Sequence, residues 1–274
     1  MLLYAKKFYE RLIFMKKGLF ILLFISFYAH NAHALRVEHQ FDVTVGLFDA
    51  SKTSFSYTLN KNTYSVNSLV STNGIFDNLY PFQAEYSSSG KITPQGLQTQ
   101  SYKYKSQSRF NTRRKELIYN DKGEPIYRIS AKNDKEKKVE IEQALSNKDT
   151  TDLQTVIAKL ALQYNQVKFC DAKMEVFDGK RRFDVIFKDE GQEVLPQVAN
   201  SPYFGKAAKC SMFIDKLGSQ GDDLLWELTQ DRPIYFWIMQ DTQTKAPFIA
   251  RILVKNTPLG KIEVTTSNIT IKDK

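Results

Sequence analysis

The chain contains 274 residues, of which 39 are Lys or Arg and 30 are Asp or Glu, giving a net charge of +9. Residues 1–34 hold five of the basic residues and one acidic residue, so the remaining 240 residues carry about +5. This mild excess argues against a nucleic-acid-binding protein but suits an anionic lipid or polymer as partner. A chain of this length can bury a core without cross-links.

The first 34 residues have the three parts of a secretory signal. Lys16 and Lys17 precede an apolar run over residues 19–29, which is too short for a membrane-spanning helix. Ala32-His33-Ala34 then places small residues at the two positions that a signal peptidase recognises. We therefore expect cleavage after Ala34 and export to the periplasm, with Met15 as an alternative start of translation. An uncleaved membrane anchor is the competing interpretation.

Strand patterns dominate the sequence that follows. Between residues 36 and 46, apolar side chains and His39 occupy every second position, which is the period of a half-buried strand. Further strands are predicted at residues 53–59, 63–70, 84–91, 97–105, 114–119 and 125–130, with a short helix at 75–81. Residues 132–149 are rich in charge and poor in aromatic side chains, so we expect a solvated loop there.

One long helix is predicted over residues 152–164. Thr151 and Gln154 fit a capping box, in which the Thr151 hydroxyl accepts the first free backbone N–H groups. Apolar side chains then recur at the spacing of a single helical face. They are Leu153, Val156, Ile157, Leu160, Ala161 and Tyr164. We expect this face to pack against a sheet.

Strand patterns resume at residues 169–177, 181–188, 207–216, 233–239, 248–255 and 261–272. Asp178-Gly179 separates the first two and predicts a two-residue turn in which both residues have positive φ. Connections of hairpin length favour antiparallel pairing. The predicted fold is α+β and mainly antiparallel β, with a single domain over residues 35–274. We expect a large curved sheet or half-open barrel with the long amphipathic helix packed on it.

The two cysteines, Cys170 and Cys210, are expected to form a disulfide, because an isolated pair usually bonds in an oxidising compartment. Two buried free thiols and a reactive redox pair are the alternatives. A redox pair is more often spaced as Cys-x-x-Cys, so the sequence disfavours that alternative.

The chain after residue 34 contains few side chains suited to catalysis. His39 is the one histidine left, which disfavours Ser-His-Asp, Cys-His and zinc chemistry. The adjacent acids Asp189-Glu190 and Asp222-Asp223 resemble turn residues, because neighbours in a strand point to opposite faces. We expect no cofactor, no metal and no enzymatic activity, with a carboxylate-based hydrolase as an alternative.

Two basic clusters are candidate binding sites. One, over residues 103–115, includes Arg113 and Arg114 and is interleaved with tyrosines. The other is Lys180-Arg181-Arg182, directly after the predicted turn. Arg recognises phosphate and carboxylate through paired hydrogen bonds, so either cluster can hold an anionic ligand. The alternative is that both are solvated edges of the sheet.

Several motifs occur in an order shared with one bacterial family. Asp152-Leu153 opens the long helix, and Cys170 precedes the segment Phe177-Asp178-Gly179-Lys180-Arg181-Arg182-Phe183-Asp184-Val185. Pro202-Tyr203-Phe204-Gly205-Lys206-Ala207-Ala208-Lys209-Cys210 follows. This pattern resembles the exported family called domain of unknown function 3108, although Lys180 stands where that family is expected to have Arg. The resemblance implies a periplasmic protein of Gram-negative bacteria with a curved sheet similar to the half-barrels of lipoprotein carriers.

By analogy with that fold, the concave aromatic face of the sheet is expected to hold an amphipathic or lipid-like ligand. A module that docks on another envelope protein, without a ligand pocket, is the main alternative.

Overall fold

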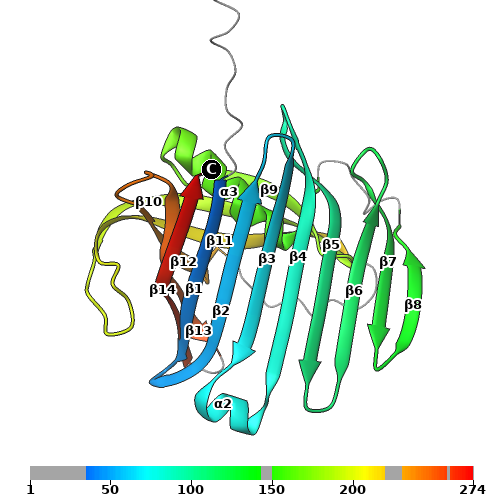
Figure 1. The fold of residues 1–274 in the computed structure, drawn as a ribbon, viewed down its shortest axis with the longest axis horizontal. Helices are drawn as coiled ribbons and strands as arrows, with labels where there is room; N and C mark the ends of the chain where they lie inside the picture. Colours follow the sequence, from blue (N-terminus) through cyan, green and yellow to red (C-terminus); the bar gives the residue numbers. More distant parts are fainter. Residues whose placement is uncertain (1–34, 143–149, 220–229, 258–259, 274) are drawn as a thin grey trace, which may run out of the picture. The chain divides into compact units, whose positions relative to one another are not determined.

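The computed structural model describes residues 35–142, 150–219, 230–257 and 260–273. The predicted signal lies outside these ranges. The described chain forms one antiparallel sheet of 14 strands together with two helices (Figure 1). The expectation of a mainly antiparallel fold is confirmed, whereas the helical part of the α+β prediction amounts to one long helix and one short one.

Apart from β8, the elements follow the predicted ones in order and in approximate position. The first eight strands are β1 (Leu35–Val45), β2 (Phe48–Leu59), β3 (Thr63–Thr72), β4 (Phe82–Thr93), β5 (Gly96–Ser108), β6 (Thr112–Tyr119), β7 (Pro125–Lys132) and β8 (Lys135–Glu140). The others are β9 (Ala172–Phe177), β10 (Arg181–Leu195), β11 (Gly205–Ser219), β12 (Ile234–Gln240), β13 (Pro247–Thr257) and β14 (Gly260–Asp273). The helices are α2 (Gly74–Leu79) and α3 (Leu153–Val167).

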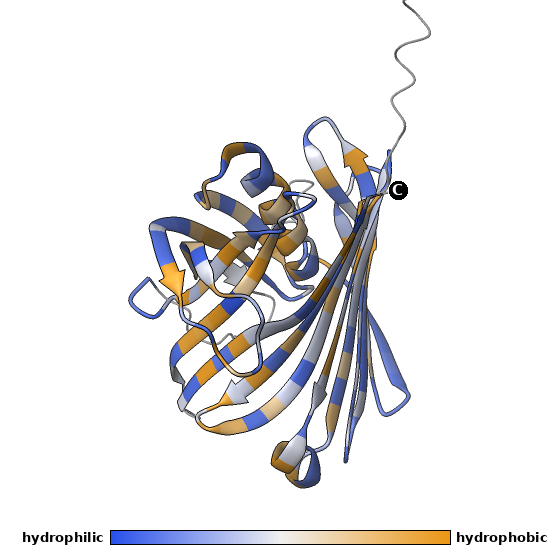
Figure 2. Ribbon diagram, turned by 60° about the vertical axis from the view of Figure 1, so that its left-hand side comes forward, coloured by the Kyte–Doolittle hydropathy of each residue, from blue (hydrophilic) through white to orange (hydrophobic). Residues whose placement is uncertain are grey.

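Pairing between β1 and β14 joins the two halves of the sheet. All other neighbours in the sheet are also neighbours in sequence, so β8 and β9 are its two edges. A sheet of this size must twist and curl, and here it curls around α3 (Figures 1 and 2). The helix contacts β3, β4, β5, β9 and β13, which places it inside the hollow.

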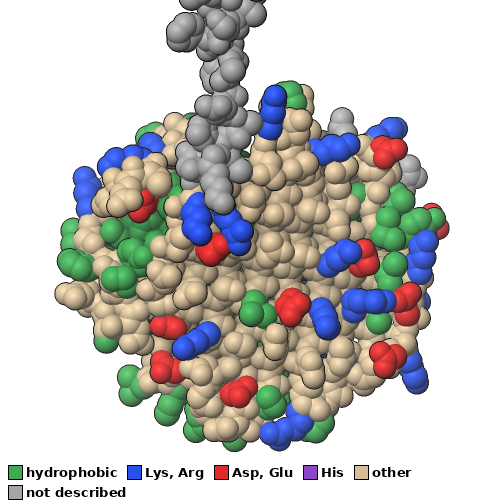
Figure 3. Space-filling model, viewed as in Figure 1, with side chains coloured by type: hydrophobic (Ala, Val, Ile, Leu, Met, Phe, Trp, Pro, Cys, Tyr) green, Lys and Arg blue, Asp and Glu red, His purple; other side chains and the backbone are tan. Residues whose placement is uncertain are grey.

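The core lies between α3 and the inner face of the sheet. Hydrophobic and hydrophilic residues alternate along the strands (Figure 2), and charges of both signs are interspersed on the outer face (Figure 3). One core cluster joins β9–β12 to Val156, Leu160 and Tyr164 of the helix, and another joins β1–β3 to Ala158. The predicted packing face of the helix is confirmed except at Leu153, which is 41% exposed.

A fully buried carboxylate fixes the start of α3. Asp152 caps the helix by accepting the backbone N–H groups of Gln154 and Thr155, at 2.9 and 3.0 Å. It also accepts hydroxyl hydrogen bonds from Ser88 on β4 at 2.5 Å, Thr99 on β5 at 2.9 Å and Thr155 at 2.7 Å. These five hydrogen bonds tie the helix to two strands of the sheet.

The predicted cap at Thr151 is therefore wrong by one residue. Thr151 lies beside the edge strand β9, where its N–H donates to the Glu175 carbonyl at 2.8 Å and its carbonyl accepts the Phe177 N–H at 2.9 Å. Gln154 does not complete a capping box, because its side-chain oxygen accepts the Ser68 hydroxyl on β3. Asp152 is the better cap because its two oxygens serve helix and sheet donors together.

The β9–β10 turn also differs from the prediction by one residue. Gly179 has a φ of 92°, but Asp178 does not have a positive φ. The turn centres on Gly179 and Lys180 and is closed by the Asp178 N–H, which donates to the Arg181 carbonyl at 3.1 Å. The Asp178 carboxylate accepts the N–H groups of Lys180 and Arg181 at 2.9 and 2.8 Å, a common role for Asp in turns.

The same hairpin reaches the strands near the opposite edge of the sheet. Arg128 on β7 donates to the Gly179 carbonyl at 2.7 Å, and Lys115 on β6 donates to the Asp178 carbonyl at 3.1 Å. A Cβ atom at position 179 would lie 2.7 Å from Leu117 Cδ2 and force that side chain to shift, and the φ of 92° itself favours glycine. Side chains thus join the two ends of the curled sheet.

The solvated loop expected over residues 132–149 contains a strand, so that prediction is corrected. β8 returns beside β7 after the turn Asn133-Asp134, in which φ is 46° and 66°. Asn and Asp tolerate this left-handed geometry, which suits a two-residue hairpin. Most β8 side chains are exposed and show no apolar alternation, so strand periodicity could not reveal it. Residues 143–149 lie outside the described ranges.

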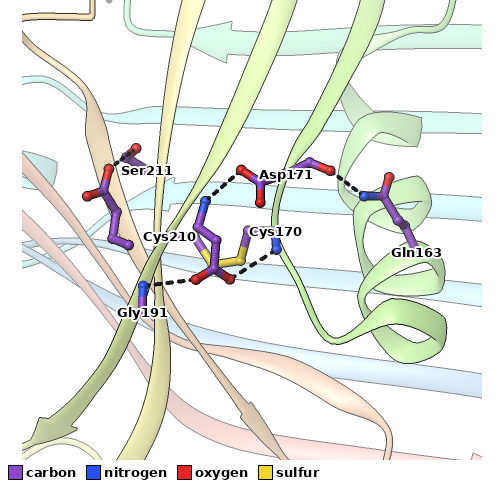
Figure 4. Close-up of a disulfide and its surroundings, with 8 residues drawn as sticks. Gln163, Cys170, Asp171, Gly191, Cys210 and Ser211 are labelled. Atoms are coloured by element: carbon purple, nitrogen blue, oxygen red, sulfur yellow. Dashed lines mark hydrogen bonds between the residues drawn. A yellow bond between two sulfur atoms is a disulfide. The ribbon is translucent and has the colours of Figure 1, made fainter.

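Cys170 and Cys210 form the predicted disulfide, with their Cα atoms 6.0 Å apart (Figure 4). Both are fully buried in the cluster between α3 and β9–β12. Asp189 on β10 accepts the N–H groups of Cys170 at 3.3 Å and Gly191 at 2.9 Å. The cross-link therefore holds the segment after α3 against β11.

Loss of the disulfide is expected to destabilise the fold. Replacing Cys170 and Cys210 by Ser should lower the melting temperature by about 5–15 °C, since a disulfide closing a loop of this length contributes about 4 kcal/mol in the chain-entropy model. Differential scanning calorimetry of the wild type, with and without reductant, and of the double variant measures this. Equal melting temperatures for all three samples would contradict it.

Removal of the Asp152 carboxylate should cost more than an ordinary helix cap. We expect Asp152→Ala to lower the free energy of unfolding by about 3–5 kcal/mol, because buried hydroxyls and two N–H groups lose their acceptor. Asp152→Asn should cost less, since one oxygen remains and the Thr hydroxyls can rotate to accept its amide. Urea denaturation checks both, and an Ala variant as stable as Asn would disprove the anchoring role.

Candidate functional site

An apolar cavity of about 290 Å³ lies between α3 and the inner face of the sheet. The side chains around it come from β1–β4, from β12–β14 and from the inner face of the helix. They include His39, Phe41, Phe55, Tyr57, Val70, Ile157, Leu160, Ala161, Phe248 and Ile252. The cavity is lined mainly by aromatic and aliphatic groups, the composition of sites that bind apolar ligands.

His39 brings a polar group into this apolar cavity. Its side chain is 5% exposed, and neither ring nitrogen has a hydrogen-bond partner among the described residues. Phe41, Phe55 and Phe248 surround the ring, with centroids 5.3 to 6.4 Å away. Burial lowers the pKa of His39 to about 4, so the neutral imidazole offers one donor and one acceptor at pH 7.

The sequence placed His39 on the buried face of β1 but did not identify it as part of a ligand site. A histidine in a run of apolar strand positions was the available signal. The role of this histidine depends on whether a hydrogen-bond partner faces its ring. The sequence does not show this, because the neighbouring side chains come from β1, β2 and β13.

A second, charged hollow adjoins the apolar cavity, and Tyr86 borders both. This cationic groove has a volume of about 600 Å³ and lies on the inner face of β5–β8, beside the β9–β10 hairpin. Its side chains include Tyr86, Tyr102, Tyr104, Arg113, Lys115, Lys132, Lys135, Lys137, Asp178 and Arg181. The molecule thus has an apolar space and a basic space side by side.

The structure separates the two arginines that the sequence grouped on β6. Arg113 faces Ser106 and Lys132 in the sheet register, on the inner face with the cationic groove. Arg114 also borders the groove, but it lies on the other face of the strand and forms an ion pair with Glu136 of β8. Neighbours in a strand lie on opposite faces, so Arg113 and Lys115 are the members of this β6 cluster that lie on the inner face.

The hairpin arginines have acidic partners within their own hairpin. Arg181 binds the Asp178 carboxylate through Nε at 2.8 Å and through a terminal nitrogen at 2.5 Å. Arg182 pairs with Glu175 on β9 at 2.7 Å. Arg181 nevertheless lines the groove together with Arg113 and Lys115, so the fold brings residues of both predicted basic clusters to one groove. A binding role for Lys180, Arg181 and Arg182 stays a prediction.

The acidic pairs noted in the sequence have structural partners where the structure describes them. Asp189 accepts backbone N–H groups beside the disulfide, and Glu190 accepts the Ser211 hydroxyl at 2.6 Å. Asp222-Asp223 lies outside the described residues. Within the described ranges, no group of three or more His, Cys, Asp or Glu side chains is arranged to hold a metal ion.

Burial of His39 should make stability depend on pH. Because the folded pKa of about 4 lies below the ordinary 6.5, the unfolded chain binds more protons between these values, and stability falls as the pH falls through that window. We expect a loss of about 2 kcal/mol between pH 7 and pH 5 from this residue. In His39→Leu that contribution should vanish. Urea denaturation of both proteins at the two pH values measures it, and identical pH dependence would contradict the assignment.

In the part of the chain that the structure describes, neither helix combines the length and apolar composition that crossing a membrane would require.

The fold has a counterpart of known structure but distant sequence. The crystal structure of a beta-barrel-like protein of the DUF1849 family from Brucella abortus superposes with a TM-score of 0.51, covering 89% of this chain and 99% of that chain at 9% identity. At that identity the likeness shows the fold alone. A comparison with curated protein sequences found no significant match. Residues 40–265 match the family described as protein of unknown function DUF3108. The chain, with its curled sheet, enclosed helix and disulfide, therefore belongs to the DUF3108 family.

Proposed function

We propose that this protein binds an amphipathic, lipid-like ligand of the cell envelope in the apolar cavity and catalyses no reaction. The observation that carries the proposal is an apolar space beside α3, lined by a buried His39 that has no hydrogen-bond partner among the described residues. An apolar pocket with a small number of polar groups is the usual form of a site for such a ligand.

The size of the cavity limits what it holds. About 290 Å³ is near the lower end of small-molecule sites, so it fits a segment of an acyl chain rather than a whole lipid. Each methylene group that leaves water contributes about 0.8 kcal/mol. Affinity should therefore rise with chain length until the space beside α3 is filled.

Export to the periplasm is part of the proposal. The signal-like segment of residues 1–34 and the Cys170–Cys210 disulfide both support it, because disulfides persist in oxidising compartments. Docking of the basic hairpin on another protein has less support, since Arg181 and Arg182 pair with acids of the same hairpin.

The cavity can be tested by filling it from the helix. Ala161→Phe should reduce binding of the neutral fluorescent probe N-phenylnaphthylamine by about tenfold or more, because the new ring occupies the ligand's space. Fluorescence titration measures the dissociation constant, and a series of saturated lysolipids should show affinity rising with chain length.

Gln166→Phe places the same side chain at an exposed position of the same helix and serves as the matched control. Thr53→Phe, which enters the cavity from β2, covers the case in which Ala161→Phe fails to fold. A wild type that binds no probe, or cavity variants that bind it as well as the control, would overturn the proposed function.

A further inference from the structure

The inner face of β6, β7 and β8 carries cations in register. Arg113 lies directly opposite Lys132, and Lys132 lies directly opposite Lys135. Two residues along, Lys115 and Lys137 flank Ser130 on the same face. Like charges at directly opposed positions destabilise a sheet, so local stability does not account for this arrangement.

The outer face of the same strands is balanced. Arg114 pairs with Glu136, Lys103 on β5 pairs with Glu116, and Lys138 lies 3.8 Å from the centroid of the Tyr127 ring. Acids and bases therefore alternate there, as Figure 3 shows for this side of the molecule. On the outer side of these strands acids thus accompany the cations, whereas the opposed inner positions of β6, β7 and β8 carry cations without acids between them.

Among the described residues, the cations of the inner face are short of acidic partners. Arg113, Lys132, Lys135 and Lys137 make no ion pair with any described residue. The nearest acid of the groove, Asp178, is bound by Arg181. Burial and the surrounding cations lower the pKa of Lys115, and the Asp178 carboxylate opposes this only in part.

The cationic groove and the apolar cavity share part of their lining. Tyr86 lines both spaces, and its ring lies 4.9 Å from that of Tyr104 in the floor of the groove. Leu153, the exposed first residue of α3, borders the groove on its helix side. A ligand whose chain lies beside α3 can therefore extend its polar end across the tyrosines toward Arg113 and Lys132.

We infer that the cationic groove binds the phosphate-bearing, net anionic head group of the same ligand whose apolar chain enters the cavity. This inference rests on the proposed function and deepens it by naming the ligand class, an anionic amphiphile. Phosphate oxygens accept charge-assisted hydrogen bonds from guanidinium and ammonium groups, which would relieve the repulsion between the opposed cations. Zwitterionic heads lack the net charge to do so.

Two lysolipids with the same myristoyl chain test the inference. Myristoyl lysophosphatidic acid should bind about tenfold more tightly than myristoyl lysophosphatidylcholine at low salt, the equivalent of one charge-assisted hydrogen bond. The difference should shrink in high salt. Arg113→Gln with Lys137→Gln should abolish this preference and leave N-phenylnaphthylamine binding unchanged. Displacement of the probe gives all the affinities.

The matched control is Lys103→Gln with Lys138→Gln, which removes the same net charge from outer-face residues that do not line the groove. It should keep the preference, and the inner variant should melt no lower than the wild type because it removes repulsion. Equal binding of the two lysolipids by a wild type that binds the neutral probe would overturn the inference and leave the proposed function standing.

A free anion is the competing occupant of the groove. Calorimetric titration with pyrophosphate distinguishes a free anion from a lipid head group as the occupant of the groove. If the acyl chain anchors the head group, pyrophosphate should bind far more weakly than the lysolipid. Pyrophosphate binding as tight as that of lysophosphatidic acid would also overturn the inference. A wild type that fails to bind the neutral probe would instead remove the proposed function itself.

Discussion

The buried Asp152 carboxylate is the interaction on which the arrangement of helix and sheet depends. It is 0% exposed and forms no ion pair with a described residue, so five hydrogen bonds stabilise its charge. Tyr64 extends the network by bonding the hydroxyls of Thr99 at 3.0 Å and Thr155 at 3.1 Å. Any movement of the helix start away from β4 and β5 would leave a buried charge unsatisfied, which costs several kcal/mol.

A second anchor near the other end of α3 explains how a hollow persists beside the helix. Gln163 donates to the Asp171 carbonyl at 2.6 Å, and the neighbouring Cys170 is cross-linked to β11 (Figure 4). With both ends held, the helix cannot settle fully onto β1–β3. An apolar cavity therefore remains beside Ile157 and Ala161. The β9–β10 hairpin, to which Arg128 donates a hydrogen bond, forms one side of the cationic groove.

The strands and the long helix could be predicted from the sequence, because alternation along β1 and the helical spacing from Val156 to Tyr164 are local signals. β8 was not predicted, because most of its side chains are exposed and its sequence shows no alternation of apolar and polar residues. The pair Asn133-Asp134 was the one local signal, since it is typical of a turn. The site could be predicted only in part. Strand period alone separates Arg113 from Arg114, but the meeting of Arg113 with Arg181 depends on how far the sheet curls, and the hydroxyl partners of Asp152 come from strands distant in sequence.

We propose that one anionic amphiphile occupies the apolar cavity and the cationic groove together. A crystal structure of the protein with bound myristoyl lysophosphatidic acid tests this most directly. We expect electron density for the acyl chain between α3 and β1–β3, near His39, with the phosphate within hydrogen-bonding distance of Arg113 or Lys132. A cavity filled by the protein's own side chains, or a phosphate bound on the outer face, would contradict it.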